Sequence, residues 1–393
     1  MKFRQLDLVA YRVNQKPGAS DVAAAFDPAR LTQARLLMGF TKTRLAEQIG
    51  VSAAAVGQWE SGTTPPRPDH IERASEVLDV PLDFFVIGRP HARLDASAAH
   101  FRKLRSTRVG ERSKAVAFVE QMWELTYALE KRVQFPHVDV PGLASGEIIE
   151  GYIANDPAAA ARSLRQYWGL GSGPVSHLVR TMELHGIIVT LVAFAGKDTP
   201  RIDAFSTSKL SRPLVVLTPD RADDVYRHRF TAAHELGHLL LHHDALPGDV
   251  RQEKDADVFA AEFLTPESEI GPHLSPRVDF SSLERTSRTW GVSMKSLIYR
   301  SRELGLFSEA TARRAYQRLN QMENLGFFAA EPVTHYPGEM PSLLGRAFEV
   351  AESQGLTLDH LSRELKWKLP YLRRLLGQDD SRPELRLVQN REE

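Results

Sequence analysis

The sequence contains no cysteine among its 393 residues. This absence excludes disulfide bonds, cysteine-ligated zinc sites, iron–sulfur clusters and cysteine nucleophiles. Any metal ion must therefore be held by histidine, aspartate or glutamate side chains. A net charge is also absent, because 50 lysine and arginine residues balance 50 aspartate and glutamate residues. Attraction to nucleic acid must consequently come from a local cluster of cations.

Long hydrophobic runs are missing as well. The longest strand-like apolar stretch spans Ile187 to Phe194, far short of the roughly 18–20 residues that a membrane-spanning helix needs. The residues that follow Met1 lack the apolar segment of a secretory signal. The proportions of hydrophobic residues (42%) and charged residues (25%) are those of an ordinary globular protein. We therefore expect a cytoplasmic protein of two to four domains with no membrane partner.

Changes in the character of the sequence divide the chain into five parts. In order, we predict an N-terminal arm (1–27), a helix-turn-helix bundle (28–88), a basic connector with an amphipathic linker helix over 115–132 (89–144), a zincin-like domain (145–330) and a C-terminal helical module (331–393). The fourth part mixes helical patterns with strand signals at 187–194, 203–207 and 213–218. The predicted fold class is mainly α with a small β-sheet (α+β).

The second part begins with the signals of three short helices, and the first of them ends at Gly39. Thr41 precedes a helix that ends at Gly50, and Ser52 precedes another that ends at Gly62. Two short helices joined by a tight glycine-containing turn form a helix-turn-helix, whose second helix enters the DNA major groove.

Residues at many fixed offsets resemble the Xre/Cro-type helix-turn-helix domain. The matching residues are Ala34-Arg35, Gly39-Phe40-Thr41, Leu45-Ala46, Gly50-Val51-Ser52, Val56, Trp59-Glu60-Ser61-Gly62 and Pro66. The resemblance implies a double-stranded DNA operator as partner and a homodimer as the common form of the protein.

The predicted DNA-binding residues include few side chains that can form hydrogen bonds with bases. They are Lys42, Arg44, Ser52, Ala53, Ala54, Gln58 and Arg67. The three cations are candidates for phosphate contacts. Alanines at the start of the recognition helix can touch thymine methyl groups but make no bidentate contact with a base. A bundle used for dimerisation or protein contact is the alternative.

The strongest chemical signal is the motif His234-Glu235-Leu236-Gly237-His238. Histidines four residues apart share one face of a helix, so both imidazoles can bind one zinc ion. Glu235 follows the first ligand directly and is placed to act as a general base. The alternative is a buried helix whose histidines are satisfied by hydrogen bonds.

A second helix downstream supplies carboxylates. Glu253 can complete a His₂Glu zinc site, and Asp257, one turn later, can accept the spare ring N–H of a ligand histidine. This is the gluzincin spacing. Asp255 is the rival third ligand, on the other side of the helix from Glu253. His242 and His243 are expected to be surface or packing residues rather than ligands.

Residues from about 160 to 266 are similar to the ImmA/IrrE family of metallopeptidases. The matching segments are Tyr167-Trp168-Gly169-Leu170, Glu183 to Ile187, Ile202 to Phe205, Arg229 to His238 and Glu253 to Pro266. Asp255 departs from the glutamate common in the family. The resemblance implies a zinc peptidase that cleaves a repressor, often of Xre type. We considered His228, Arg229 and Tyr299 as stabilisers of the oxyanion, and the strands at 187–194 and 213–218 as an edge for an extended substrate.

Three hypotheses follow from these motifs. The first is a DNA-binding regulator with a zinc endopeptidase that acts on a repressor-type protein or on itself. The second is a transcription factor whose zinc domain only senses a ligand. The third is an antitoxin-like autorepressor that binds a toxin. The tail at 356–376 predicts two short helices, either a second helix-turn-helix or a docking module.

Overall fold

The structure, a computed structural model, describes residues 17–92, 94, 100–101, 109–143, 156–192, 204–218, 224–242 and 249–378. Contacts between residues divide the chain into two compact units. The first comprises residues up to 91 together with 359–369, and the second comprises 92–358 and the residues from 370 onward. Four cations of the predicted basic connector, Arg102, Lys103, Arg105 and Arg108, lie outside the described residues.

The first unit is a bundle of short helices. Its elements are α1 (Ala19–Ala24), α2 (Pro28–Leu37), α3 (Lys42–Ile49), α4 (Ala53–Glu60), α5 (Pro68–Val77), the 3-10 helix η1 (Leu82–Phe85) and most of α16 (Leu358–Leu365). Side-chain caps begin the helices where the sequence predicted them: the Thr41 hydroxyl accepts from the Arg44 amide at 3.1 Å, and the Ser52 hydroxyl accepts from the Ala55 amide at 3.2 Å. Gly50 ends α3 with a φ of 75°, which favours glycine.

Two segments outside the predicted range 28–88 belong to this unit. Helix α1, in the segment predicted to be an arm, packs against α5 and buries Val22. Helix α16 buries Leu361, and the Arg89 guanidinium donates a hydrogen bond to the carbonyl of Leu365. Residues 359–369 therefore belong to the same compact unit as the first 91 residues.

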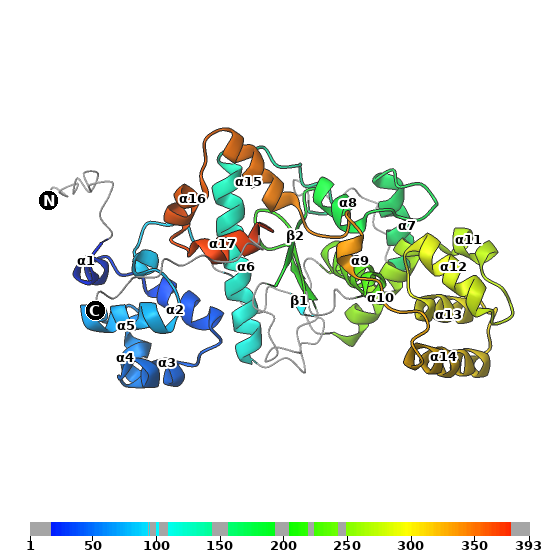
Figure 1. Ribbon diagram of the computed structural model, residues 1–393, viewed down its shortest axis with the longest axis horizontal. Helices are drawn as coiled ribbons and strands as arrows, with labels where there is room; N and C mark the ends of the chain where they lie inside the picture. The colour runs from blue at the N-terminus through cyan, green and yellow to red at the C-terminus, as the bar shows by residue number, and fades with distance from the viewer. Residues whose placement is uncertain are drawn as a thin grey trace, which may run out of the picture. The chain divides into compact units, whose positions relative to one another are not determined.

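The second unit contains a small sheet surrounded by helices (Figure 1). The strands are β1 (His100–Phe101), β2 (Ile188–Leu191), β3 (Ala204–Thr207) and β4 (Leu214–Leu217), in the order β1-β3-β4-β2. Strands β2 and β4 are parallel, and the other two pairs are antiparallel. The three predicted strands are confirmed, and β1 is an addition to them. The proposed substrate edge at 213–218 is wrong, because β4 is paired on both sides, whereas β2 is an edge of the described sheet.

The helices account for most of the described residues of this unit, and the small sheet accompanies them, so the predicted α+β class is confirmed. They are α6 (Val109–Glu130), α7 (Pro157–Tyr167), α8 (Leu178–Leu184), α9 (Val225–Leu241), α10 (Val250–Leu264), α11 (Glu267–Ile270), η4 (Gly271–His273), α12 (Phe280–Trp290), α13 (Met294–Glu303), α14 (Glu309–Asn324), η5 (Val333–His335), α15 (Leu343–Ser353) and α17 (Leu369–Leu375). The linker helix predicted over 115–132 is α6, and it is buried on most sides rather than amphipathic. Within the described ranges, no helix is both long enough and apolar enough to cross a membrane.

Helices α9 and α10 lie side by side and form the framework of the candidate site (Figure 1). Helix α9 also packs against β3 and β4, and α10 packs against α7. Small residues permit the close approach: a β-carbon added to Gly237 would lie 3.0 Å from the Phe259 ring. Ala232 and Ala233 are fully buried beside it. Close packing of these two helices holds their side chains in a fixed relation.

Candidate metal centre and DNA-binding face

Helix α9 presents both motif histidines and Glu235 toward the interior. Asp224 caps the helix by accepting from the Tyr226 amide at 3.0 Å. Because His234 and His238 are one turn apart, their rings converge, and the two Nε2 atoms lie 3.1 Å apart. All three side chains are at most 1% exposed.

Helix α10 adds a carboxylate to the two imidazoles. Glu253 Oε2 lies 3.6 Å from His234 Nε2, and Glu253 Oε1 lies 3.4 Å from His238 Nε2. Within the described residues, these three side chains form the group that can hold a metal ion, with their ligand atoms within 4.8 Å of one another. Asp255, the rival ligand, faces Arg251 instead, at 3.9 Å.

The chemistry and spacing of these atoms fit zinc. Tetrahedral coordination with zinc–nitrogen bonds of ~2.0–2.1 Å places ligand atoms roughly 3.3 Å apart. The three observed separations, 3.1, 3.4 and 3.6 Å, bracket this value. Burial raises the pKa of Glu253, but hydrogen bonds from His234 and His238 outweigh it and hold the pKa at about 2. The carboxyl group is therefore ionised at neutral pH, as a metal ligand must be.

The second ring nitrogens of the two histidines are engaged away from the convergence point. Asp257 Oδ1 lies 2.8 Å from His234 Nδ1, which is the contact expected of Asp257. His238 Nδ1 lies 3.0 Å from Nδ1 of His242, a residue that is only 7% exposed. Both contacts leave the Nε2 atoms of His234 and His238 directed to the metal position.

His242, expected to be a surface or packing residue, contacts a histidine of the candidate site. The signal was present, because His242 follows His238 by four residues, as His238 follows His234. Repetition at i, i+4 and i+8 keeps all three on one face of the helix. His242 is not a rival ligand in this geometry, because it meets the Nδ1 side of His238 rather than its Nε2 side.

Glu235 receives a hydrogen bond from the sheet. The hydroxyl of Ser206, a fully buried residue of β3, donates to Glu235 Oε2 at 2.7 Å. A hydrogen bond to a carboxylate stabilises its ionised form and fixes its orientation. The contact of Ser206 with Glu235 could not be predicted from a local sequence pattern, because the two residues are 29 positions apart. They come together only because β3 packs on α9.

Two of the residues considered for oxyanion stabilisation are engaged elsewhere. His228 Nε2 lies 2.9 Å from the carbonyl oxygen of Glu339. The Arg229 guanidinium binds the buried carboxylate of Glu339 and donates to the carbonyl of Gly291 at 2.9 Å. The two contacts with Glu339 fasten the first half of α9 to the segment before α15, and the bond to Gly291 fastens it to the turn between α12 and α13. Tyr299 lines a separate pocket described below.

The candidate DNA-binding residues lie on α3, α4 and the turn before α5. All seven, Lys42, Arg44, Ser52, Ala53, Ala54, Gln58 and Arg67, are exposed. The charge they offer is partly neutralised within the unit. Lys42 Nζ lies 3.4 Å from Glu60, and Arg67 lies 3.3 Å from Asp69. The Arg44 guanidinium stacks on the Phe40 ring, at 4.3 Å from its centroid.

A buried helix pair that brings two histidines and a glutamate together, with a second glutamate adjacent in the sequence, forms a candidate metal site of the zincin type. Comparison with known families agrees with this geometry: residues 182–302 match the IrrE N-terminal-like domain, Peptidase_M78, and residues 31–85 match a helix-turn-helix family, HTH_3. The chain thus joins an Xre-like helix-turn-helix domain to an ImmA/IrrE-type peptidase domain. No curated protein matches the chain significantly. These findings support a DNA-binding regulator that carries a protease-like domain.

Proposed function

We propose that the protein is a transcriptional regulator whose zinc-dependent endopeptidase domain hydrolyses a peptide bond in a repressor-type protein or in the chain itself. The observation that carries the proposal is the convergence of His234, His238 and Glu253 beside Glu235. The same three ligand types, two histidines and one glutamate, hold catalytic zinc in gluzincins.

The residues of the chain divide the chemistry among them. Zinc held by His234, His238 and Glu253 would supply a Lewis acid that activates water and polarises the peptide carbonyl. Glu235 takes a proton from the attacking water and returns it to the leaving amine. The Ser206 hydroxyl, which donates a hydrogen bond to Glu235 Oε2, orients the carboxylate for that transfer.

The helix-turn-helix domain supports DNA as the second partner, and we propose that this partner is an operator in double-stranded DNA. Lys42, Arg44 and Arg67 would bind phosphates, and Ser52, Ala53, Ala54 and Gln58 would face the base edges. We further propose a homodimer on the DNA and a cytoplasmic location, which is where a regulator meets its operator. A toxin as partner belongs to the antitoxin hypothesis.

The metal centre is tested by elemental mass spectrometry of the purified wild-type and His238→Ala proteins after zinc supplementation. We expect about one zinc per chain in the wild type and loss of zinc in the variant, because three ligands hold the ion. Absence of zinc from the wild type would overturn the peptidase proposal.

The activity is tested with Glu235→Gln. The zinc-loaded protein is incubated alone and with a library of quenched fluorescent peptides, and fragments are identified by mass spectrometry. We expect wild-type cleavage, and in the variant loss of cleavage with full zinc content, because Glu235 is not a ligand. Zinc-loaded wild type that cleaves neither itself nor any peptide would favour the sensor hypothesis.

A further inference from the structure

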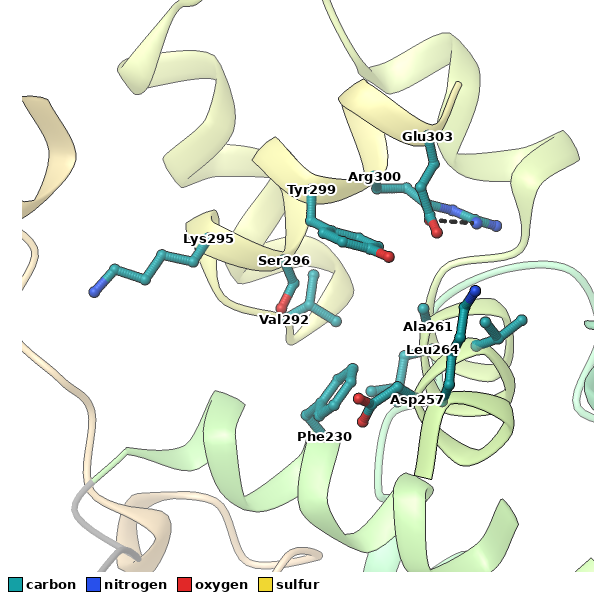
Figure 2. Close-up of a pocket in the computed structure, with 12 residues that line it drawn as sticks. Phe230, Asp257, Ala261, Leu264, Val292, Lys295, Ser296, Tyr299, Arg300 and Glu303 are labelled. Carbon is teal, nitrogen blue, oxygen red and sulfur yellow. Dashed lines mark hydrogen bonds and ion pairs between the residues drawn. The ribbon is translucent and has the colours of Figure 1, made fainter. Parts of the chain in front are cut away.

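A pocket of about 350 Å³ lies next to the metal centre, between α9, α10 and α13. Figure 2 shows Phe230 and Asp257 on one side of it and Tyr299, Ser296 and Arg300 on the other. This volume is in the range of sites for small molecules, roughly 300–1,000 Å³.

The walls of the pocket are largely apolar. The aromatic rings of Phe230 and Tyr299 come from different helices, and aliphatic side chains complete the lining. These are Val258, Ala261, Leu264 and Val292. An aromatic and aliphatic lining favours the burial of a flat apolar body.

Among the charged residues that line the pocket, one cation forms no ion pair with another described residue. Five lining residues are charged: Lys254, Asp257, Lys295, Arg300 and Glu303. Asp257 binds His234, Lys295 binds Glu323 at 2.7 Å, and Arg300 binds Glu262 and Glu303. Lys254 has no ion-pair partner in the part of the chain that the structure describes, so its ammonium group is available to an anion.

Asp257 belongs to both sites. Its carboxylate accepts from Nδ1 of the ligand histidine His234 at 2.8 Å, and the same side chain lines the pocket. Partners of this kind affect metal affinity by roughly 10–100-fold when they are removed. A molecule in contact with Asp257 therefore acts on the orientation of a metal ligand without touching the metal.

We propose that this pocket is a regulatory site for a small, flat monoanion, whose apolar body lies between Phe230 and Tyr299 and whose charge pairs with Lys254. Its occupancy is coupled to metal affinity through Asp257. The site requires no peptidase activity. The coupling rests on the proposed metal centre, whereas anion binding does not.

The test uses the full-length protein and 1-anilinonaphthalene-8-sulfonate, a flat apolar monoanion whose fluorescence rises on binding. We expect saturable binding to the wild type, about tenfold weaker binding to Lys254→Gln and loss of the saturable phase in Ala261→Phe, which fills the cavity. Lys295→Gln is the matched control, because Lys295 lines the same pocket but extends away from it (Figure 2) and pairs with Glu323.

Each result decides one part of the proposal. Absence of saturable binding to the wild type, or equal binding to wild type and Ala261→Phe, would overturn the site. Equal weakening by Lys254→Gln and Lys295→Gln would overturn the role of Lys254. Titrations with and without zinc measure the coupling: we expect the probe affinity to change severalfold, and zinc affinity to change by the same factor when the probe is present. Identical affinities in both states would overturn the coupling while leaving the peptidase proposal untouched.

Discussion

Each histidine of the proposed metal site has two ring nitrogens, and the two make different contacts. In His234 and His238, Nε2 faces the metal position, and Nδ1 contacts a neighbouring side chain. When Nε2 binds a metal, the ring proton of a neutral imidazole resides on Nδ1 and needs an acceptor. Asp257 is that acceptor for His234, and Nδ1 of His242 is the acceptor for His238.

Replacing His242 therefore tests the second contact. We expect His242→Leu to bind zinc roughly 10–100-fold more weakly, because His238 loses the acceptor that fixes its tautomer. His242→Asn, whose amide oxygen accepts, should recover part of the affinity. Competition against a chelator measures both, and His273→Leu serves as the control histidine. Equal zinc affinity for wild type and His242→Leu would show that the contact has no such role.

Ser206 offers a matched test at the general base. In Ser206→Ala, Glu235 loses a hydrogen bond to a charged group, a type of interaction that contributes about 1.5–3 kcal/mol. We expect kcat for the cleaved peptide to fall roughly tenfold to a hundredfold. KM and zinc content should stay unchanged, and Ser206→Thr should restore part of kcat. A rise in KM with unchanged kcat would instead indicate a role in substrate binding.

At the scale of elements, α9 is held by close packing in its second half and by polar contacts in its first half. Its second half packs against α10 through Gly237 and Phe259. Its first half is held by the polar contacts of His228 and Arg229 with Glu339. Loss of one partner of a buried ion pair costs about 3–5 kcal/mol, so the Arg229–Glu339 pair secures the helix that carries His234 and His238.

His228 makes the stability of this region depend on pH. Burial lowers the pKa of His228, more than its hydrogen bond to Glu339 raises it. The unfolded chain therefore binds the proton more readily, and the free energy of unfolding falls as the pH drops below about 6.5. Denaturant titrations between pH 7.5 and 5.5 should show a smaller loss for His228→Gln than for the wild type. Parallel losses in both proteins would exclude His228 as the cause.

The elements that local spacing determines were predictable from the sequence. The histidines of α9 and the carboxylates of α10 follow helical periodicity, so Glu253 and Asp257 were placed correctly relative to one another. Ser206 and Glu339 were not predictable, because each reaches α9 only through tertiary packing. The mispredicted edge at 213–218 has the same cause: strand order depends on long-range pairing, and the pattern of a single strand does not contain it.

At the scale of the whole molecule, the net charge is zero, so we expect the affinity for DNA to depend on a few cations of the helix-turn-helix domain. Because Lys42 is partly neutralised by Glu60, we expect Arg44 to contribute more to phosphate binding. Arg44→Gln should reduce the magnitude of the negative slope of log K against log[salt] by about 0.9, the value for one phosphate contact. Lys42→Gln should reduce that magnitude by less. Fluorescence anisotropy on a duplex at several salt concentrations measures the slope, with Arg313→Gln, on α14, as control. An unchanged slope in Arg44→Gln would remove it from the interface.

The course of the chain through the two units has a consequence for self-processing. Residues 359–369 return to the unit formed by the first 91 residues, where the Arg89 guanidinium donates a hydrogen bond to the carbonyl of Leu365. A nick in the connector between His91 and Val109 would break the covalent link, yet the larger fragment would keep α16. We expect the two fragments to stay together as a complemented pair, as a split protein does. After a single cut, the fragment with the helix-turn-helix domain would remain non-covalently bound to the larger fragment. The rate at which the two fragments dissociate would then depend on the rate at which α16 unfolds or detaches.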